Sequence, residues 1–203
     1  MPNKEVILSG LAGIASQYST VAIAWHIAIY VFILLLVIGL RPPKRLSSIM
    51  ATMPLLSVAV FAFLANNPFT AIVLGAASLL LMMFGILMPK GKVKVAINPN
   101  LFLGIPMLLY GLVYPHFLEN IQFFQYAIMA PVGLVPCPTL STVIGLALFM
   151  NAFGSKKWPI TLSVFGLFYG LFGVFRLGVM LDIGLILGSI GLLISAIIAK
   201  KET

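Results

Sequence analysis

The sequence predicts an all-α fold: a polytopic membrane helix bundle of about seven transmembrane helices, with its N-terminus outside and its C-terminus cytoplasmic. Of its 203 residues, 62% are hydrophobic and 8% are charged, which leaves too little polar surface for a water-soluble domain. Apolar runs of roughly 20 residues, each long enough to cross a bilayer, alternate with short polar connections. We therefore expect residues 1–203 to form a single integral membrane domain.

The individual elements follow from the apolar runs and from helix-breaking residues. Residues 1–19 form an outer N-terminal segment, interpreted as a short surface helix, because Glu5 beside Lys4 is atypical of a cleaved signal sequence. The pair Pro42-Pro43 ends the first span, since paired prolines cannot continue a helix, and Pro68 follows a tight outer turn. The predicted spans are residues 20–40, 48–65, 69–88, 97–115, 132–152, 158–175 and 180–199, and residues 116–131 form an outer loop at the lipid–water interface.

The charged residues predict the orientation of the chain. If the chain starts outside, ten of the twelve lysines and arginines lie on the cytoplasmic side, and only Lys4 and Arg176 lie outside. Three of the four acidic residues lie outside, and Glu202 alone lies inside. Because the basic residues stand in short groups between apolar runs, the net charge of +8 indicates topology and not nucleic-acid binding. We expect an integral protein of a prokaryotic cytoplasmic membrane.

The most specific local feature is the P-C-P-T motif, Pro136-Cys137-Pro138-Thr139, at the start of the fifth span. Prolines remove backbone donors and fix φ, so we expect a kinked or non-helical beginning there, with carbonyl groups open to Thr139, Ser141, water or an ion. One interpretation is a thiol or soft-ligand site near the outer leaflet. The other is a packing kink in which the small side chain of Cys137 is simply buried.

Four side chains of the outer half are candidate metal ligands: His26, His116, Cys137 and Met180. Imidazole, thiolate and thioether groups bind copper or zinc, so these are the metal cofactors that the set indicates. Asp182, at the start of the last span, is a further candidate binding residue, or a structural one that caps the helix or pairs with Arg176. No two of these residues have a spacing, such as H-x-x-x-H, that would place both on one face of a helix. Each of them therefore also has a purely structural interpretation.

Small residues recur along the last two spans at steps of three or four. They are Ser163, Gly166, Gly170 and Gly173 in one span, and Gly184, Gly188, Gly191 and Ser195 in the other. Such stripes allow helices to approach closely. We predict that they pack within the chain in preference to forming a dimer or partner interface.

Catalytic signatures are missing from the sequence. It contains no G-x-S-x-G elbow, Walker loop, H-E-x-x-H pair or paired inner carboxylates. The single cysteine, Cys137, excludes a disulfide framework and a dithiol redox cycle within the chain. We therefore expect no enzyme activity from the chain by itself.

The chain resembles the multi-pass membrane family DUF6064. The likeness rests on the P-C-P-T motif followed by an apolar helix, on Tyr114-Pro115 before it and on residues 180–185 after it. It extends over about residues 15–198 and includes the aromatic stretch 18–25 and the basic proline loop 41–45. The chain departs from the family at Leu140, where a second threonine is common. The resemblance implies a membrane bundle and no particular activity.

Two functions remain open at this point. The first is a non-catalytic integral membrane subunit packing within a larger membrane protein complex, for which smooth glycine faces and little mass outside the membrane suffice. The alternative is a small permease or binding protein with an outer-side solute or soft-metal site around the P-C-P-T motif. The expected partners are membrane lipids and, under the first hypothesis, other integral membrane subunits.

Overall fold

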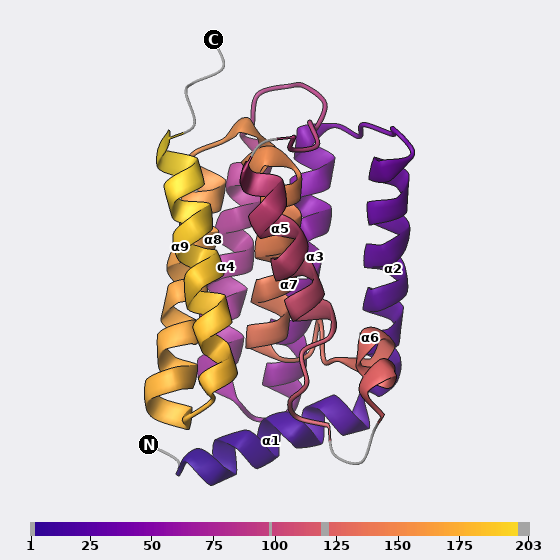
Figure 1. The fold of residues 1–203 in the computed structure, drawn as a ribbon. Coiled ribbons are helices and arrows are strands. Elements are labelled where there is room, and N and C mark those ends of the chain that lie inside the picture. The colour runs from indigo at the N-terminus through magenta and orange to yellow at the C-terminus, as the bar shows by residue number, and fades with distance from the viewer. Residues whose placement is uncertain (1–2, 98, 119–121, 199–203) are drawn as a thin grey trace.

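The chain folds as a bundle of upright helices with one helix lying across its end (Figure 1). The computed structural model describes residues 3–97, 99–118 and 122–198, and no β-strand occurs within these ranges. The α-helices are α1 (Lys4–Gln17), α2 (Ser19–Val37), α3 (Lys44–Leu64), α4 (Pro68–Ile86), α5 (Pro99–Leu112), α6 (Tyr126–Met129), α7 (Pro136–Phe149), α8 (Lys157–Leu171) and α9 (Ile183–Ile198). The 3₁₀ turns η1 (Phe123–Gln125), η2 (Asn151–Gly154) and η4 (Met180–Asp182) and the π-helical segment η3 (Phe172–Leu177) complete the regular structure of these ranges.

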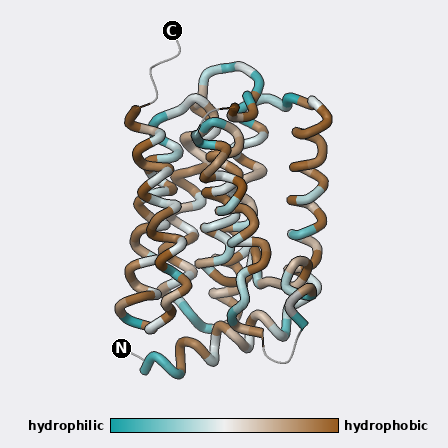
Figure 2. The backbone as a smooth tube through the Cα atoms, in the orientation of Figure 1, coloured by the Kyte–Doolittle hydropathy of each residue, from teal (hydrophilic) through white to brown (hydrophobic). Residues whose placement is uncertain are grey.

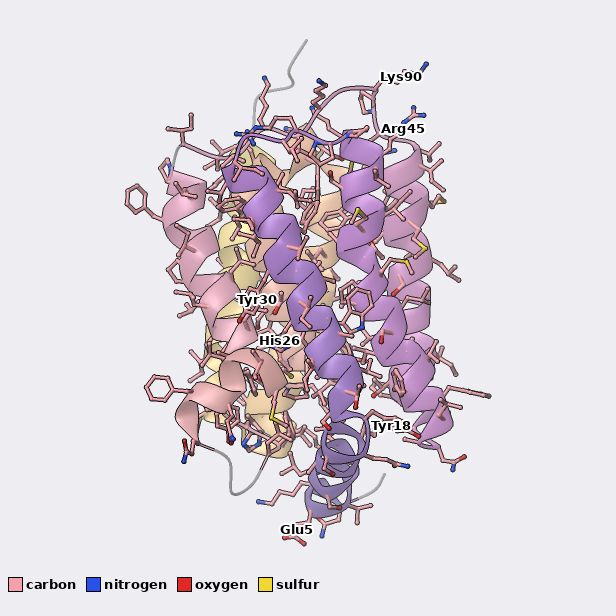
Figure 3. The ribbon with its side chains drawn as sticks, turned by 90° about the vertical axis from the view of Figure 1, so that its right-hand side faces the viewer. Glu5, Tyr18, His26, Tyr30, Arg45 and Lys90 are labelled. Carbon is pink, nitrogen blue, oxygen red and sulfur yellow. The ribbon has the colours of Figure 1, made fainter. Side chains whose placement is uncertain are left out.

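The two ends of the bundle differ in charge. Helix α1 with Glu5 lies at one end, which we name the α1 end, and Arg45 and Lys90 lie at the other, which we name the basic end (Figure 3). Hydrophobic residues predominate along the upright helices between these ends (Figure 2). The described basic loops thus gather at one end, as predicted from the sequence. Four residues of the predicted charge pattern lie outside the described residues: Glu119, Lys200, Lys201 and Glu202.

Among the described residues, five helices are long and apolar enough to cross a membrane. They are Ser19–Val37, Lys44–Leu64, Pro68–Ile86, Lys157–Leu177 and Met180–Ile198. The predicted spans 97–115 and 132–152 contain the shorter apolar helices α5 and α7, each of 14 residues. At 1.5 Å per residue such a helix is about 21 Å long, against a hydrocarbon thickness of about 30 Å. The chain is therefore a multi-pass helix bundle in which α5 and α7 are shorter than the five helices of spanning length.

Helix α7 lies at the centre of the bundle. All 14 of its residues are buried, and it packs against α3, α5, α8 and α9. A helix enclosed by protein on all sides does not contact lipid, so its hydroxyl groups must bond within the protein. Thr142 donates to Pro138 O at 2.9 Å, which satisfies one of them. The Ser141 hydroxyl has no hydrogen-bond partner within the described ranges.

A left-handed turn follows α7 at the basic end. Asn151, Ala152 and Phe153 have φ values of 50°, 51° and 57°, and Gly154 follows with φ 62°. Non-glycine residues seldom adopt this conformation, so neighbouring contacts must hold it. Phe153 is buried edge-on against Trp158, with ring centroids 4.8 Å apart, and Asn100 donates to the Asn151 side chain at 3.0 Å. The turn redirects the chain into α8.

The glycines of the last two spanning helices are used in contacts within the chain. Gly166, Gly170 and Gly173 lie against α9 or η4, whereas Gly184, Gly188 and Gly191 lie against α5. At each of the six positions, a methyl group would come within 3.0 Å of an atom of the facing element. The predicted packing within the chain is therefore confirmed, although the two stripes face different neighbours and not each other.

Candidate functional site

The segment that leads into α7 is non-helical and buried. Its backbone turns at Pro131, whose carbonyl accepts from Leu134 N at 3.2 Å and from Val135 N at 3.0 Å. Gly133 has φ +79°, and a methyl group there would lie 2.1 Å from the Trp25 ring of α2. Glycine is therefore required at this position both for its conformation and for the close approach of the ring.

The P-C-P-T motif combines a helix start with a side chain that bonds to the segment before the helix. Pro136 and Pro138 occupy the first turn of α7, where backbone N–H groups have no partner within the helix, so the prolines remove no helical hydrogen bond. The Thr139 hydroxyl accepts from Gly133 N at 2.8 Å and donates to Val135 O at 2.6 Å. The non-helical part predicted for this span therefore ends at Val135, and Thr139 connects it to the helix.

Cys137 brings the motif into contact with the last spanning helix. Its thiol donates to Asp182 Oδ2, with the sulfur 3.2 Å from the oxygen, and the Tyr114 hydroxyl donates to Oδ1 at 2.7 Å. Asp182 is 1% exposed and Tyr114 is fully buried. Tyr110, one helical turn before Tyr114, donates to the carbonyl of Leu181. We name Tyr114, Cys137 and Asp182 the Asp182 cluster.

A widened helical turn makes room for the carboxyl group. Helix α8 continues into the π-helical segment η3, and Gly173 of this segment lies against Asp182. A methyl group at Gly173 would lie 1.7 Å from Asp182 Oδ2, so any residue other than glycine would displace the carboxylate. Insertions of π-helix into α-helices often occur at functional sites. This glycine is the last of the predicted stripe, and its role is to admit a polar group.

A cavity of about 30 Å³ adjoins the Asp182 cluster. Its lining comes from many regions of the chain and includes Ile7 and Leu11 of α1, Thr70 of α4, Phe117 of the connection after α5, Cys137 of α7, Tyr169 of α8, Gly173 of η3 and Asp182 of η4. The N-termini of α4, α7 and α9 all reach this region: Thr70 and Cys137 lie in the first turns of α4 and α7, and Asp182 of η4 directly precedes α9. The positive ends of three helix dipoles therefore stabilise negative charge at the carboxylate, whereas burial penalises it.

One hydroxyl group that lines the cavity lacks a partner. Tyr169 is 4% exposed, and its hydroxyl forms no hydrogen bond among the described residues. A buried polar group without a protein partner normally bonds to water or to a ligand. The cavity at Tyr169 is large enough for a water molecule, which needs about 10–15 Å³. The arrangement thus offers the carboxylate of Asp182 and the hydroxyl of Tyr169, which lies beside Thr70, to a species of that size.

The four predicted metal ligands do not form one site. No group of three or more His, Cys, Asp and Glu side chains is close enough to hold a metal ion in the part of the chain that the structure describes. His26 on α2 (Figure 3) lies with Nδ1 2.8 Å from Ala22 O and Nε2 3.0 Å from Leu112 O, so both ring nitrogens face backbone carbonyls. Met180 is 68% exposed. The predicted copper or zinc site therefore has no support from the geometry.

His116 lies in an aromatic setting at the α1 end. Its ring is 4.3 Å from the Phe117 ring and 6.4 Å from the Tyr114 ring, measured between centroids. Burial lowers the pKa of His116 below its ordinary value, because the charged imidazolium is less well solvated there. A neutral imidazole packed among rings fits the interfacial interpretation of this residue better than the role of a metal ligand.

Sequence reasoning identified two members of the cluster and missed their connection. Cys137 and Asp182 were both candidate residues, but 45 positions separate them and no spacing rule joins them. Tyr114 entered only through the Tyr114-Pro115 pair of the family resemblance, and Tyr169 was not singled out. A usable signal was present in Gly173, because a small residue in a membrane helix marks a place where another group approaches closely.

Comparisons of the chain with protein-family models, with curated proteins and with solved structures found no match. The resemblance to DUF6064 therefore stays a prediction, and the class of protein is defined by the fold and the site: a multi-pass membrane bundle with a buried carboxylate cluster at its α1 end.

Proposed function

We propose that the protein is a small membrane permease or binding protein whose solute site lies at the α1 end, around the P-C-P-T motif and Asp182. The observation that carries this proposal is the buried carboxylate of Asp182, bonded to Cys137 and Tyr114 beside a small cavity. Ionisable groups are costly inside a membrane protein, and they commonly mark sites of ion or solute handling. Short helices with non-helical continuations, as in α5 and α7, are also typical of transport sites.

The alternative of a non-catalytic subunit in a larger membrane complex has weaker support. Its main argument was the presence of smooth glycine faces that a partner helix could contact. These faces instead contact α5, α9 and η4 of the same chain. The remaining exposed apolar side chains, such as Ile72 and Leu79 on α4, are equally suited to lipid. Membrane lipids are therefore the partners that this proposal requires.

The topology that we propose has seven membrane-embedded helices, with the α1 end outside and the basic end in the cytoplasm of a prokaryotic cell. The positive-inside rule supports this orientation. Glu5 and Lys90 are exposed and lie at opposite ends of the bundle (Figure 3). In a Cys137→Ser background, Glu5→Cys should react with an impermeant thiol reagent added outside intact cells, and Lys90→Cys should not. The reverse labelling pattern would contradict the proposed orientation.

The native thiol allows the site itself to be tested without an added reporter. Cys137 is the single cysteine, is 7% exposed and lines the cavity. If the site opens to the outside during function, N-ethylmaleimide should alkylate Cys137 in native membranes slowly but to completion. The matched control is Ser163→Cys in a Cys137→Ser background, because Ser163 is fully buried on α8 and does not line the cavity.

The labelling experiment has a clear contrary outcome. Equal resistance of Cys137 and of the Ser163→Cys thiol would mean that the site stays closed, and the permease proposal would then fail. Faster alkylation of Cys137 supports it, because the two thiols are alike in burial and differ in their access to the cavity. A shift in the alkylation rate upon addition of a candidate solute would further identify that solute.

A further inference from the structure

The cavity beside Asp182 limits what the proposed site can bind. Its volume of about 30 Å³ accommodates one or two species of the size of water. Organic solutes are larger than this. Leu11 of α1 and Phe117 contribute apolar side chains to the lining. The polar groups of the lining come from the upright helices and from η4. The binding partner is therefore a small inorganic species, a water molecule or a proton.

The two groups that donate hydrogen bonds to Asp182 are neutral, and neither is a cation. Both partners, the Tyr114 hydroxyl and the Cys137 thiol, are neutral donors. Donors of this kind orient a carboxylate and stabilise its charge without neutralising it. A carboxylate that is 1% exposed is strongly penalised by its loss of hydration, whereas the three helix N-termini oppose this penalty. Because the loss of hydration and the helix N-termini act in opposite directions, Asp182 can change its charge by taking up or releasing a proton.

Tyr169 supplies the second polar group that such a site needs. Its buried hydroxyl has no hydrogen-bond partner in the described ranges, and it lines the same cavity as Asp182. A hydroxyl both donates and accepts, so a water molecule in the cavity can bond to Tyr169 and to the carboxylate together. The hydroxyl of Tyr169 therefore shares a cavity with Asp182, the single buried acid of the described part of the chain.

We infer that Asp182 is a proton-binding site that exchanges its proton with the aqueous phase at the α1 end through water in this cavity. In the exchange a hydronium ion transfers its proton to the carboxylate, giving a neutral carboxylic acid and a water molecule. The inference rests on the proposed permease function and names the proton as the species that the site handles.

Other titratable groups around Asp182 are few. Tyr110 and Tyr114 approach from α5 and the connection after it, Cys137 from α7 and Tyr169 from α8. Arg176 of η3 is exposed, as are Lys4 and Glu5 of α1, the helix that packs against η3. Phenol and thiol groups ordinarily keep their protons around neutral pH. His116, whose ring lies 6.4 Å from the Tyr114 ring, is a further group that titrates below its ordinary pKa of about 6.5, so the titration of Asp182 must be followed at its own carboxyl group.

The chain offers an unusually direct test, because Asp182 is its only aspartate. Aspartate labelled with ¹³C at its side-chain carboxyl therefore gives a signal from one residue in NMR spectra of the protein in liposomes. We expect this signal to move from the ionised to the protonated position as the pH is lowered. Tyr169→Phe should shift the midpoint of the titration, and Tyr126→Phe should not, because the Tyr126 hydroxyl donates to Leu118 O and does not line the cavity.

The arms of the experiment separate a proton from a metal cation. A signal that moves when choline is replaced by sodium or potassium at constant pH, and does not move with pH, would overturn the inference in favour of an alkali-ion site. A signal that responds to neither change would overturn it as well. A response to pH with unreactive Cys137 would support the proton site and refute the permease proposal. Reactive Cys137 with a silent Asp182 signal would refute the proton site alone.

Discussion

The glycine stripes of α8 and α9 follow the same sequence pattern and meet different neighbours. In α9, methyl groups at Gly188 and Gly191 would meet the flexible ends of Met107 and Leu103, at 2.3 Å and 2.0 Å. On the α8 side, methyl groups at Gly166 and Gly173 would meet the Ser189 hydroxyl at 2.3 Å and the Asp182 carboxylate at 1.7 Å. Gly188 and Gly191 thus pack apolar side chains, whereas Gly166 and Gly173 admit polar groups into the bundle. Gly170 meets Ile186 and Gly184 meets the Tyr110 ring, so the pattern alone does not reveal the role of each position.

The largest effect is expected from Gly173→Ala, which would remove the space that this glycine leaves for the Asp182 carboxylate. The added methyl group would force Asp182 away from both Cys137 and Tyr114, leaving a buried carboxylate unpartnered. We expect a loss of about 3 kcal/mol in the free energy of unfolding, of the order found when a buried charged group loses its hydrogen bonds. Equilibrium unfolding in mixed micelles measures it. Faster alkylation of Cys137 should accompany the loss, and wild-type stability would contradict the assigned contact.

A matched pair of tyrosine substitutions would separate the contributions of the two hydroxyl groups near Asp182. Tyr114→Phe removes a buried donor from Asp182 and should lower the free energy of unfolding by about 1–2 kcal/mol. Tyr169→Phe removes a hydroxyl with no hydrogen-bond partner among the described residues, so it should be neutral within about 0.5 kcal/mol or slightly stabilising. Unfolding curves of the two variants measured in parallel decide the matter. Equal losses would show that both hydroxyls are bonded in the protein.

A smaller effect is expected from Gly188→Ala on the apolar stripe. The added methyl group meets the thioether end of Met107, which can adopt another rotamer. Overpacking that a flexible neighbour can relieve should cost about 1 kcal/mol. The same unfolding measurement applies, and the alkylation rate of Cys137 should equal that of the wild type. A changed rate would mean that the two stripes are coupled, contrary to the comparison.

The smallest effect is expected from Gly10→Ala in α1. A methyl group there would meet nothing within 4 Å, so the substitution tests the backbone alone. Alanine is favoured over glycine in a helix interior by about 0.5–1 kcal/mol, and we expect a stabilisation of up to this size. Circular dichroism and unfolding in micelles would detect it. A destabilised variant would show that Gly10 faces a neighbour, and it would then belong with the packing glycines.

The sequence-based expectations succeed where composition and periodicity carry the information. Five of the predicted spans are helices of spanning length, and the small residues of the last two spans pack within the chain. The length of α7 was overestimated because an apolar composition extends over the buried non-helical segment 132–135, where the backbone conformation delays the start of the helix. The predicted span 97–115 likewise exceeds α5, which ends at Leu112. An apolar run alone does not distinguish a membrane helix from a buried segment that is apolar but not helical.

The candidate site was predicted only in part, for a related reason. Cys137 and Asp182 stood out as polar residues in an apolar chain, but their contact depends on the π-helical turn at Gly173, and no local signal in the sequence specifies that turn. His26 was grouped with them by depth in the membrane, although α2 and α7 lie apart in the bundle (Figure 1). Similar depth does not establish proximity, and the predicted metal site failed on this point.

Proton uptake by Asp182 is tested most directly by measuring the movement of charge that it causes. Proteoliposomes that contain the wild-type protein should show a charge displacement on a solid-supported membrane when the external pH is stepped, because Asp182 takes up a proton inside the low-dielectric bundle. Asp182→Asn should abolish this displacement, and the exposed Glu5→Gln, which removes an acid of the same end, should leave it unchanged. An equal displacement from the wild type and from Asp182→Asn would contradict the assignment of the site to Asp182.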